Sequence, residues 1–174
     1  MPNGIIVFGA NGCGKTTLGF ELARRLNMKH LDVENYYFEE SEIPYSKPRS
    51  KDTVIERMLV DIKRCDSFVL SAVTGDYGDQ ISSMYKLGVF LSVPVHIRLE
   101  RVERRSLERY GERVLVGGDM YEKEQGFLEF VKTRDLSAID EWAKTLTCPI
   151  LHLDGTKAVP ENIQLIIERY SRIK

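Results

Sequence analysis

The feature that most constrains this chain is a glycine-rich run near its amino terminus, Gly9-Ala10-Asn11-Gly12-Cys13-Gly14-Lys15-Thr16. The run has the spacing G-x-x-x-x-G-K-T. It follows the apolar residues 5–8 and precedes Leu18, Leu22 and Leu26, which share one face of a helix. A strand, a glycine-rich turn and a helix in this order place backbone N–H groups and the positive end of a helix dipole around a phosphate. The run therefore predicts a phosphate-binding loop.

Each part of this loop has an expected task in binding a nucleoside triphosphate. The glycines allow the backbone to approach the phosphates closely. We expect Lys15 to reach the β- and γ-phosphates and the Thr16 hydroxyl to bind Mg²⁺. Cys13 is either a small residue that fits the loop or a redox-sensitive thiol. The expected phosphate-binding residues are Asn11, Gly12, Cys13, Gly14, Lys15, Thr16 and Thr17.

Strand and helix patterns alternate along the rest of the chain. Strands are predicted over residues 4–9, 29–33, 67–73, 89–91 and 150–153. Helices are predicted over residues 15–27, 51–65, 80–87, 94–110, 120–133 and 135–146, and from Pro160 onwards. This alternation predicts an α/β fold: one domain over residues 1–174, with a five-stranded parallel sheet and helices on both faces. In such sheets ligands bind at the carboxyl ends of the strands.

Composition narrows the class of protein. Hydrophobic residues make up 43% and charged residues 29% of the chain, and the net charge is −1, so we expect neither nucleic acid nor membrane as a partner. No apolar run approaches the roughly 20 residues of a membrane span, and residues 1–4 lack the features of a signal peptide. Three cysteines without a C-x-x-C pair fit reduced thiols. These observations predict a cytoplasmic protein and leave its oligomeric state open.

Two acids follow the second predicted strand, Asp32 and Glu34. If that strand lies near the first, both carboxylates stand beside the bound triphosphate. A carboxylate in that position can accept the proton of an attacking hydroxyl, or it can hold Mg²⁺ directly or through water. The other interpretation is a pair of solvated acids at a strand end. We assign Asp32 and Glu34 to catalysis, with Asp32 also a metal ligand and Glu34 also a contact of the acceptor.

The stretch over residues 34–64 is the expected acceptor-binding region. Its first part, 34–49, is predicted to be irregular and is crowded with aromatic residues, which either stack on a planar acceptor or anchor the loop. Tyr36 is assigned to the acceptor on the first interpretation, and Arg49 is expected to pair with an anionic acceptor. Asp76, after the third strand, either helps to order Mg²⁺ waters near the acceptor or simply belongs to a turn.

Arginines recur along the helix predicted over 94–110. Arg98, Arg101, Arg105 and Arg109 form roughly one stripe, and Arg113 continues the spacing into a glycine-rich segment. Like charges at this spacing weaken a helix rather than support it. A stripe of arginines that leads into a glycine-rich segment favours a lid over residues 111–134 that closes on phosphates. The other interpretation is a solvated helix bridged by its glutamates. We assign Arg101 to the nucleotide, Arg105 to catalysis, and Arg109 and Arg113 to the acceptor. Arg134 is a further candidate, and Val95, Leu99 and Val102 are expected to face inward.

Together these motifs resemble the adenylate kinase and shikimate kinase branch of the P-loop kinases. The matching pieces are residues 9–17, Leu31-Asp32-Val33-Glu34, the Arg101…Arg105 helix, and Asp154-Gly155-Thr156-Lys157. The resemblance implies a P-loop three-layer sandwich with strand order 2-3-1-4-5 and a small lid, Mg-ATP as donor, and a small acceptor bound over 34–64. It also implies that the backbone of Gly155 and Thr156 reads adenine. The family's Asp-x-Asp motif is replaced here by Asp32-x-Glu34, and the arginines with which adenylate kinases bind AMP have no clear counterpart.

The function predicted from the sequence is transfer of the γ-phosphate of Mg-ATP to a small-molecule acceptor. The acceptor is nucleotide-like, nucleoside-like or a hydroxy acid, and the sequence does not name it. The alternative is a non-catalytic or slowly hydrolysing ATP-binding switch.

Overall fold

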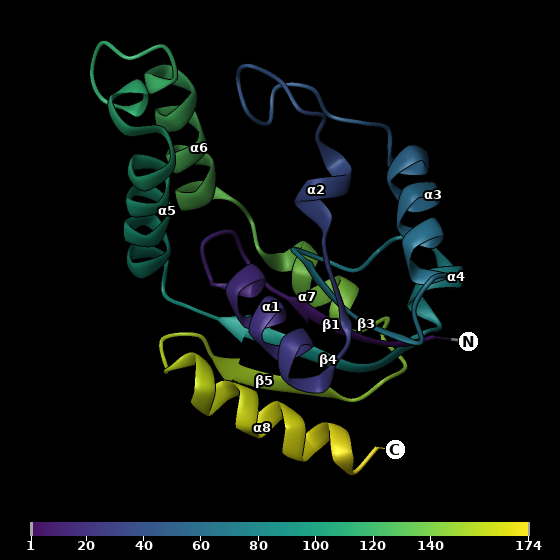
Figure 1. Cartoon of the computed structure of the whole chain (residues 1–174). Helices are drawn as coiled ribbons and strands as arrows, with labels where there is room; N and C mark the ends of the chain where they lie inside the picture. The colour runs from purple at the N-terminus through teal and green to yellow at the C-terminus, as the bar shows by residue number, and fades with distance from the viewer. Residues whose placement is uncertain (1, 174) are drawn as a thin grey trace.

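The computed structural model describes residues 2–173, and a parallel sheet forms its centre (Figure 1). Every strand pairs in parallel with its neighbours, in the order β2-β3-β1-β4-β5. The strands are β1 (Asn3–Phe8), β2 (Lys29–Asp32), β3 (Ser67–Ala72), β4 (Tyr85–Ser92) and β5 (Ile150–Asp154). The predicted α/β architecture and strand order are confirmed. In this order β3 lies between β1 and β2, so the carboxyl ends of these three strands meet at one edge of the sheet. Ligands bind at that edge in sheets of this kind.

Side chains alternate along the central strand β1 and so divide the core into two layers. Ile5 and Val7 pack with residues of α1 (Lys15–Leu26) and α8 (Val159–Ser171) on one face. Ile6 and Phe8 pack on the other face, against the remaining sheet-covering helices. Those helices are α3 (Lys51–Ile62), α4 (Asp79–Ser82) and α7 (Ser137–Ala143). The strand is buried on both faces, as a parallel sheet requires.

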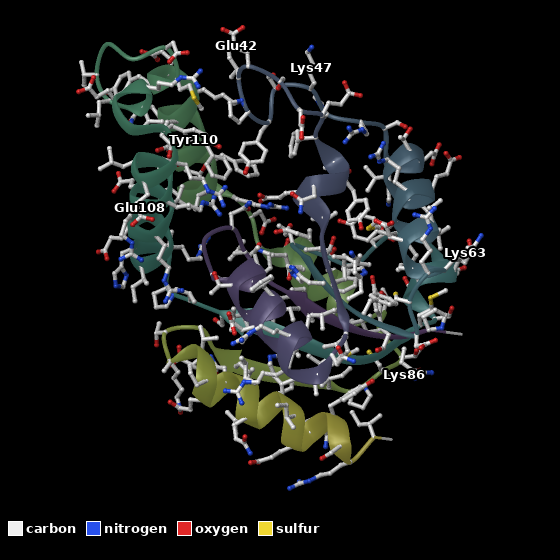
Figure 2. The ribbon with its side chains drawn as sticks, viewed as in Figure 1. Glu42, Lys47, Lys63, Lys86, Glu108 and Tyr110 are labelled. Atoms are coloured by element: carbon white, nitrogen blue, oxygen red, sulfur yellow. The ribbon has the colours of Figure 1, made fainter. Side chains whose placement is uncertain are left out.

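A helical hairpin rises from the carboxyl edge of the sheet (Figure 1). It consists of α5 (Val95–Tyr110), the short η1 (Gly111–Val114) and α6 (Tyr121–Thr133). Opposite the hairpin stand α2 (Val33–Tyr37) and the loop that leads to α3, with Glu42 and Lys47 at the tip of that loop (Figure 2). The hairpin contains the segment expected to act as a lid. None of the helices within residues 2–173 has both the length and the apolar character needed to span a bilayer.

Three local predictions were wrong. The helix predicted over 80–87 ends at Ser82, and the chain enters β4 at Tyr85 because that residue pairs with Gly4 of β1; tertiary pairing outweighs local preference here. The stretch predicted to be irregular begins with α2, whose N-terminus the Asp32 carboxylate caps. Val95 was expected to face inward but is 40% exposed, and the buried position on that turn belongs to Arg98.

Candidate active site

The phosphate-binding loop joins β1 to α1 and is open on one side. Gly14 is the N-cap of α1, with φ 95°, and it has no side chain that could cap the first N–H groups of the helix. A Cβ placed on Gly14 would have its nearest neighbour at 3.8 Å. A Cβ on Gly12 (φ 80°) would instead lie 2.6 Å from the carbonyl oxygen of Arg98. The loop therefore packs tightly against α5 on one side and leaves the other side free for an anion.

Lys15 lies across the inside of this loop. Its Nζ donates to the carbonyl oxygen of Ala10 at 2.9 Å, so the ammonium is already held within the curve of the backbone. Thr16 and Thr17 follow on the first turn of α1, where both are exposed and line the adjacent cavity. This is the geometry in which a lysine and a hydroxyl group can meet phosphate oxygens together.

Two arginines of α5 donate hydrogen bonds to the backbone of the phosphate-binding loop and of the segments next to it. The guanidinium of Arg98, a residue only 5% exposed, donates to the carbonyl oxygens of Val93 (3.1 Å) and Asn11 (3.3 Å). Arg101, one turn later, donates to the carbonyl oxygens of Cys13 (3.3 Å) and Gly155 (3.0 Å). The first two arginines of the stripe thus bind protein carbonyls and connect the loop to its surroundings.

A third arginine reaches the loop from the end of α6. Arg134 donates to the Asn11 side-chain oxygen at 2.9 Å, and its guanidinium lies 5.2 Å from the ring centre of Phe130. Burial lowers the pKa of Arg134 from its usual value. The hairpin is therefore tied to the phosphate-binding loop at both of its ends, through α5 and through α6.

A cavity of about 820 Å³ opens beside the loop at the carboxyl edge of the sheet. Six cationic side chains and three acidic ones line it. The cations are Lys15, Arg101, Arg104, Arg105, Arg134 and Lys157; the acids are Asp32, Glu34 and Glu108. The excess of positive charge suits a polyanion such as a triphosphate. The volume lies within the range of small-molecule and cofactor sites.

The two acids after β2 differ in their local bonding. One oxygen of Asp32 accepts a hydrogen bond from the backbone N–H of Glu34 at 3.1 Å, which fixes the carboxylate at the start of α2. Within residues 2–173 the carboxylate of Glu34 has neither an ion-pair nor a hydrogen-bond partner, and it lines the cavity. Glu34 is therefore the acid that is free to take a proton, whereas Asp32 is held in place.

A polar chain beneath α1 links β2 and β3 to the loop. Nε2 of His30 lies 3.0 Å from the Ser71 hydroxyl, and that hydroxyl donates to the carbonyl oxygen of Lys15 at 3.1 Å. Burial lowers the pKa of His30, although the nearby Asp32 carboxylate works in the opposite direction. The neutral imidazole thus supports the first turn of the helix that carries the loop lysine.

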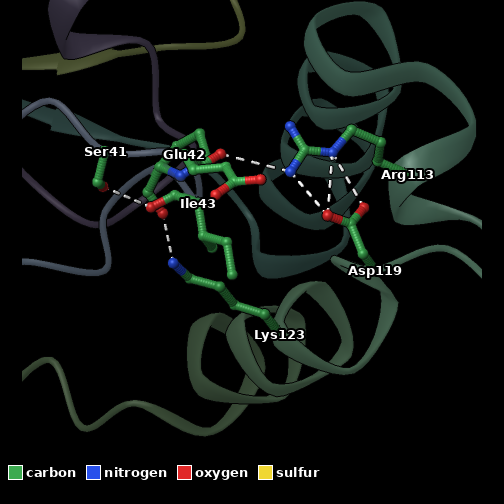
Figure 3. A network of polar contacts seen from close by, with 7 residues as sticks. Ser41, Glu42, Ile43, Arg113, Asp119 and Lys123 are labelled. Carbon is green, nitrogen blue, oxygen red and sulfur yellow. Dashed lines mark hydrogen bonds and ion pairs between the residues drawn. The ribbon is translucent and has the colours of Figure 1, made fainter.

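The loop between α2 and α3 contacts the hairpin at its far end (Figure 3). Arg113 binds the Asp119 carboxylate at 2.8 Å and the carbonyl oxygen of Glu42, while Lys123 donates to the carbonyl oxygen of Pro44. Arg109 donates to the Tyr45 hydroxyl at 3.1 Å. These contacts join the loop to the hairpin.

Most of the residues predicted for the donor side come together. The loop residues 11–17 line the cavity with Asp32, Glu34, Arg101, Arg105 and Gly155. A Cβ on Gly155 would lie 3.0 Å from the Cys13 carbonyl oxygen, so the turn after β5 sits directly against the loop. Thr156 does not line the cavity; its hydroxyl donates to the Asp154 carboxylate at 2.6 Å.

Several residues predicted for the acceptor side lie elsewhere. The Tyr36 hydroxyl donates to Asp61 of α3 at 2.7 Å, and Arg49 donates to the carbonyl oxygens of Tyr36 and Phe38. Asp76 forms an exposed ion pair with Lys51 at 2.9 Å. Arg113 is at the tip of the hairpin, as described above, whereas Arg109 lines a second, smaller cavity.

Sequence reasoning missed residues of α6 that line these two cavities. Phe130 lines the two cavities, and Phe127 stacks on it with a centre-to-centre distance of 6.3 Å. Glu124, one turn earlier than Phe127, lines the smaller cavity. The spacing i, i+3, i+6 on a helix placed beside the arginine stripe could have pointed to this face.

The donor set fits Mg²⁺. The residues described contain no cluster of three or more His, Cys, Asp or Glu side chains that could hold a metal by themselves. Mg²⁺ at phosphoryl-transfer sites takes one or two protein oxygens and completes its shell with phosphates and water. The Thr16 hydroxyl and the Asp32 carboxylate, which line the same cavity, are oxygen donors of that kind.

Comparison with known proteins places this chain in a family. A family model described as an AAA domain (AAA_18) matches residues 5–126, from β1 into α6. The chain belongs to this AAA domain family. It is 32% identical over 179 residues to the uncharacterized protein YqaC of Bacillus subtilis (strain 168), with 98% of this chain and 99% of that protein covered.

Solved structures share the fold of this AAA domain protein. The shikimate kinase from Acinetobacter baumannii, in complex with shikimate, superposes with a TM-score of 0.59 at 19% identity, covering 100% of this chain and 96% of that one. A gluconokinase from Sinorhizobium meliloti 1021 gives 0.57 at 14% identity, covering 99% and 93%. The predicted likeness to P-loop small-molecule kinases of the adenylate and shikimate kinase type is confirmed.

Proposed function

We propose that this AAA domain protein transfers the γ-phosphate of Mg-ATP to a hydroxyl or phosphate oxygen of a small-molecule acceptor. The observation that carries the proposal is one cavity that unites three things: an open phosphate-binding loop, the Glu34 carboxylate and the Arg105 guanidinium. Within residues 2–173 neither Glu34 nor Arg105 has a side-chain hydrogen-bond or ion-pair partner. A nucleotide-binding protein needs the first of these three things; phosphoryl transfer to a hydroxyl also makes use of a proton acceptor and a free cation.

On this proposal the donor lies along the loop. The backbone N–H groups of residues 12–17 and Lys15 bind the β- and γ-phosphates, and the turn at Gly155 flanks the adenine. Arg101 links that turn to the loop and keeps the two halves of the nucleotide site together. Thr16 and Asp32 would hold Mg²⁺, which neutralises phosphate charge when bound.

The chemical step uses Glu34 and the cations that line the cavity. An acceptor hydroxyl oxygen forms a bond to the γ-phosphorus as the bond from that phosphorus to the β,γ-bridging oxygen breaks, and ADP leaves. The proton of the hydroxyl passes to Glu34. Arg105 and Arg134, with Lys15, stabilise the negative charge that spreads over the transferred group. The Asp32 carboxylate, which accepts a hydrogen bond from the backbone N–H of Glu34, stays at the start of α2.

The test uses Lys15→Met. The side chain of methionine keeps most of the length of lysine and removes the charge, so the fold should be retained while transfer from γ-labelled ATP falls by about 10²-fold or more. Circular dichroism and the melting temperature serve as controls for folding. Slow release of phosphate without any phosphorylated acceptor, across a panel of nucleosides, hydroxy acids and amino alcohols, would favour an ATP-binding switch instead. Unchanged transfer by folded Lys15→Met would refute the proposal.

A further inference from the structure

A second cavity of about 360 Å³ lies between the α5–α6 hairpin and the loop that follows α2. It adjoins the nucleotide cavity, and a set of junction residues lines both. These are Asn11, Glu34, Phe38, Arg105 and Phe130. A molecule in the second cavity would therefore present one end to Glu34 and the phosphate-binding loop, and its other end would lie deeper between hairpin and loop.

The middle of this second cavity is aromatic. Phe38 and Tyr45 meet edge to face, with ring centres 5.1 Å apart, and Phe127 stacks on Phe130. The Tyr45 ring is placed there by a left-handed backbone (φ 60°), a conformation that non-glycine residues adopt at a cost and that is often found at binding sites. Burial, followed by the nearby Glu34 carboxylate, raises the pKa of the Tyr45 hydroxyl. Walls of this kind accept a flat ring.

Charge decides what the far end of the cavity can bind. Three cations line the cavity, and two of them already serve the loop: Arg109 donates to the Tyr45 hydroxyl and Lys123 to the carbonyl oxygen of Pro44. The third, Arg105, stands at the junction with the nucleotide cavity. Beyond the junction the charged group that is free is an acid, because Oε1 of Glu124 is buried and has no hydrogen-bond partner within residues 2–173. A buried carboxylate oxygen without a partner favours a ligand that donates an N–H.

We propose that this second cavity binds the phosphate acceptor, and that the acceptor is an alcohol with a planar ring and an amine or other N–H donor at its far end. The inference rests on the proposed function, because only a phosphoryl-transfer enzyme has a phosphate acceptor. The hydroxyl lies at the junction beside Glu34, the ring lies among the aromatic side chains, and the amine donates to Glu124. A hydroxy acid of the same size would place its carboxylate against Glu124, where neither of the cations of residues 2–173 that line the cavity beyond the junction is free.

Two probes of one shape and opposite charge test the specificity. In para-(aminomethyl)benzyl alcohol and para-(hydroxymethyl)benzoic acid, the same ring and hydroxyl carry an ammonium or a carboxylate. Ligand-observed NMR titrations on the full chain should show the ammonium probe binding about tenfold or more tightly than the acid, as expected for a charge-assisted hydrogen bond. Equal binding, tighter binding of the acid, or no binding of either probe would overturn the proposal.

Matched variants locate the effect. Glu124→Gln should remove most of the preference for the ammonium probe, whereas Glu122→Gln should keep it, because Glu122 is an exposed acid in the same first turn of α6. Lys15→Met should also keep the preference, since Lys15 does not line this cavity. An unchanged preference in folded Glu124→Gln would contradict the assignment.

The same samples separate the two proposals. With Mg-ATP added, phosphorus NMR reports whether the probe hydroxyl becomes phosphorylated. A clear preference for the ammonium probe without any phosphorylated product would support the specificity of the cavity and count against phosphoryl transfer. Transfer to other acceptors by a protein that shows no preference between the probes would leave the proposed function standing and refute this inference.

Discussion

Replacing Arg98 by methionine separates arginines that build the site from arginines that act in it. The Arg98 guanidinium is buried and holds two carbonyl oxygens, at 3.1 and 3.3 Å, that belong to Val93 and Asn11. Leaving a buried acceptor without its donor costs about 1–3 kcal/mol each, so the two together lose about 2–6 kcal/mol. Methionine fills much of the space and no longer requires a buried charge, which offsets part of this loss. We expect a net decrease of about 2–3 kcal/mol in the free energy of unfolding.

Urea denaturation measures this decrease directly. For a chain of this size the slope is about 2 kcal/mol per molar urea, so the midpoint should fall by about 1–1.5 M. Arg105→Met is the matched control on the same helix: Arg105 is half-buried and makes no hydrogen bond within residues 2–173, so its midpoint should change by no more than about 0.3 M. The effect on phosphoryl transfer should not follow the effect on stability: Arg105→Met should keep its stability and lose transfer. If Arg98→Met unfolds at the wild-type urea concentration, Arg98 is not a structural element of the loop.

Two further predictions concern the loop and its support. Gly14→Ala should lose about 1–2 kcal/mol of stability, because alanine is strained in the left-handed backbone at that position (φ 95°). Gly12→Ala should lose more, because its Cβ would also lie 2.6 Å from the Arg98 carbonyl oxygen. Equal urea midpoints for the two variants would count against this packing. The lowered pKa of His30 means that the unfolded chain takes up a proton at a higher pH than the folded chain, so stability should fall as the pH drops below 6.5 towards the folded pKa. His30→Gln should flatten this dependence between about pH 7.5 and pH 5.5, while His96→Gln, at an exposed position, should not; identical slopes for the two variants would refute the role of His30.

How far the sequence predicts the site depends on how local each feature is. The phosphate-binding loop occupies consecutive residues between a strand and a helix, so its position and the free N-terminus at Gly14 follow from the motif alone. The alternation of apolar runs and helices likewise predicts the parallel sheet. The acids at Asp32 and Glu34 could be placed near the loop because the carboxyl ends of parallel strands meet at one edge.

The arginine stripe shows where that reasoning stops. Its spacing predicts that Arg98, Arg101, Arg105 and Arg109 share a face, but spacing does not say what lies opposite each turn. Arg98 and Arg101 meet carbonyl oxygens of distant segments, Arg105 meets the cavity, and Arg109 meets a tyrosine of another loop. The partners come from parts of the chain that only packing brings together.

The sequence by itself determined the strand, loop and helix that bind phosphate, because their chemistry resides in residues that are neighbours along the chain. The tertiary structure alone decided which charged side chains remain available to a ligand. That outcome depends on which backbone carbonyls and carboxylates each side chain meets across space. Glu124, whose buried Oε1 has no hydrogen-bond partner within residues 2–173, lines an aromatic cavity and indicates the chemistry of the acceptor.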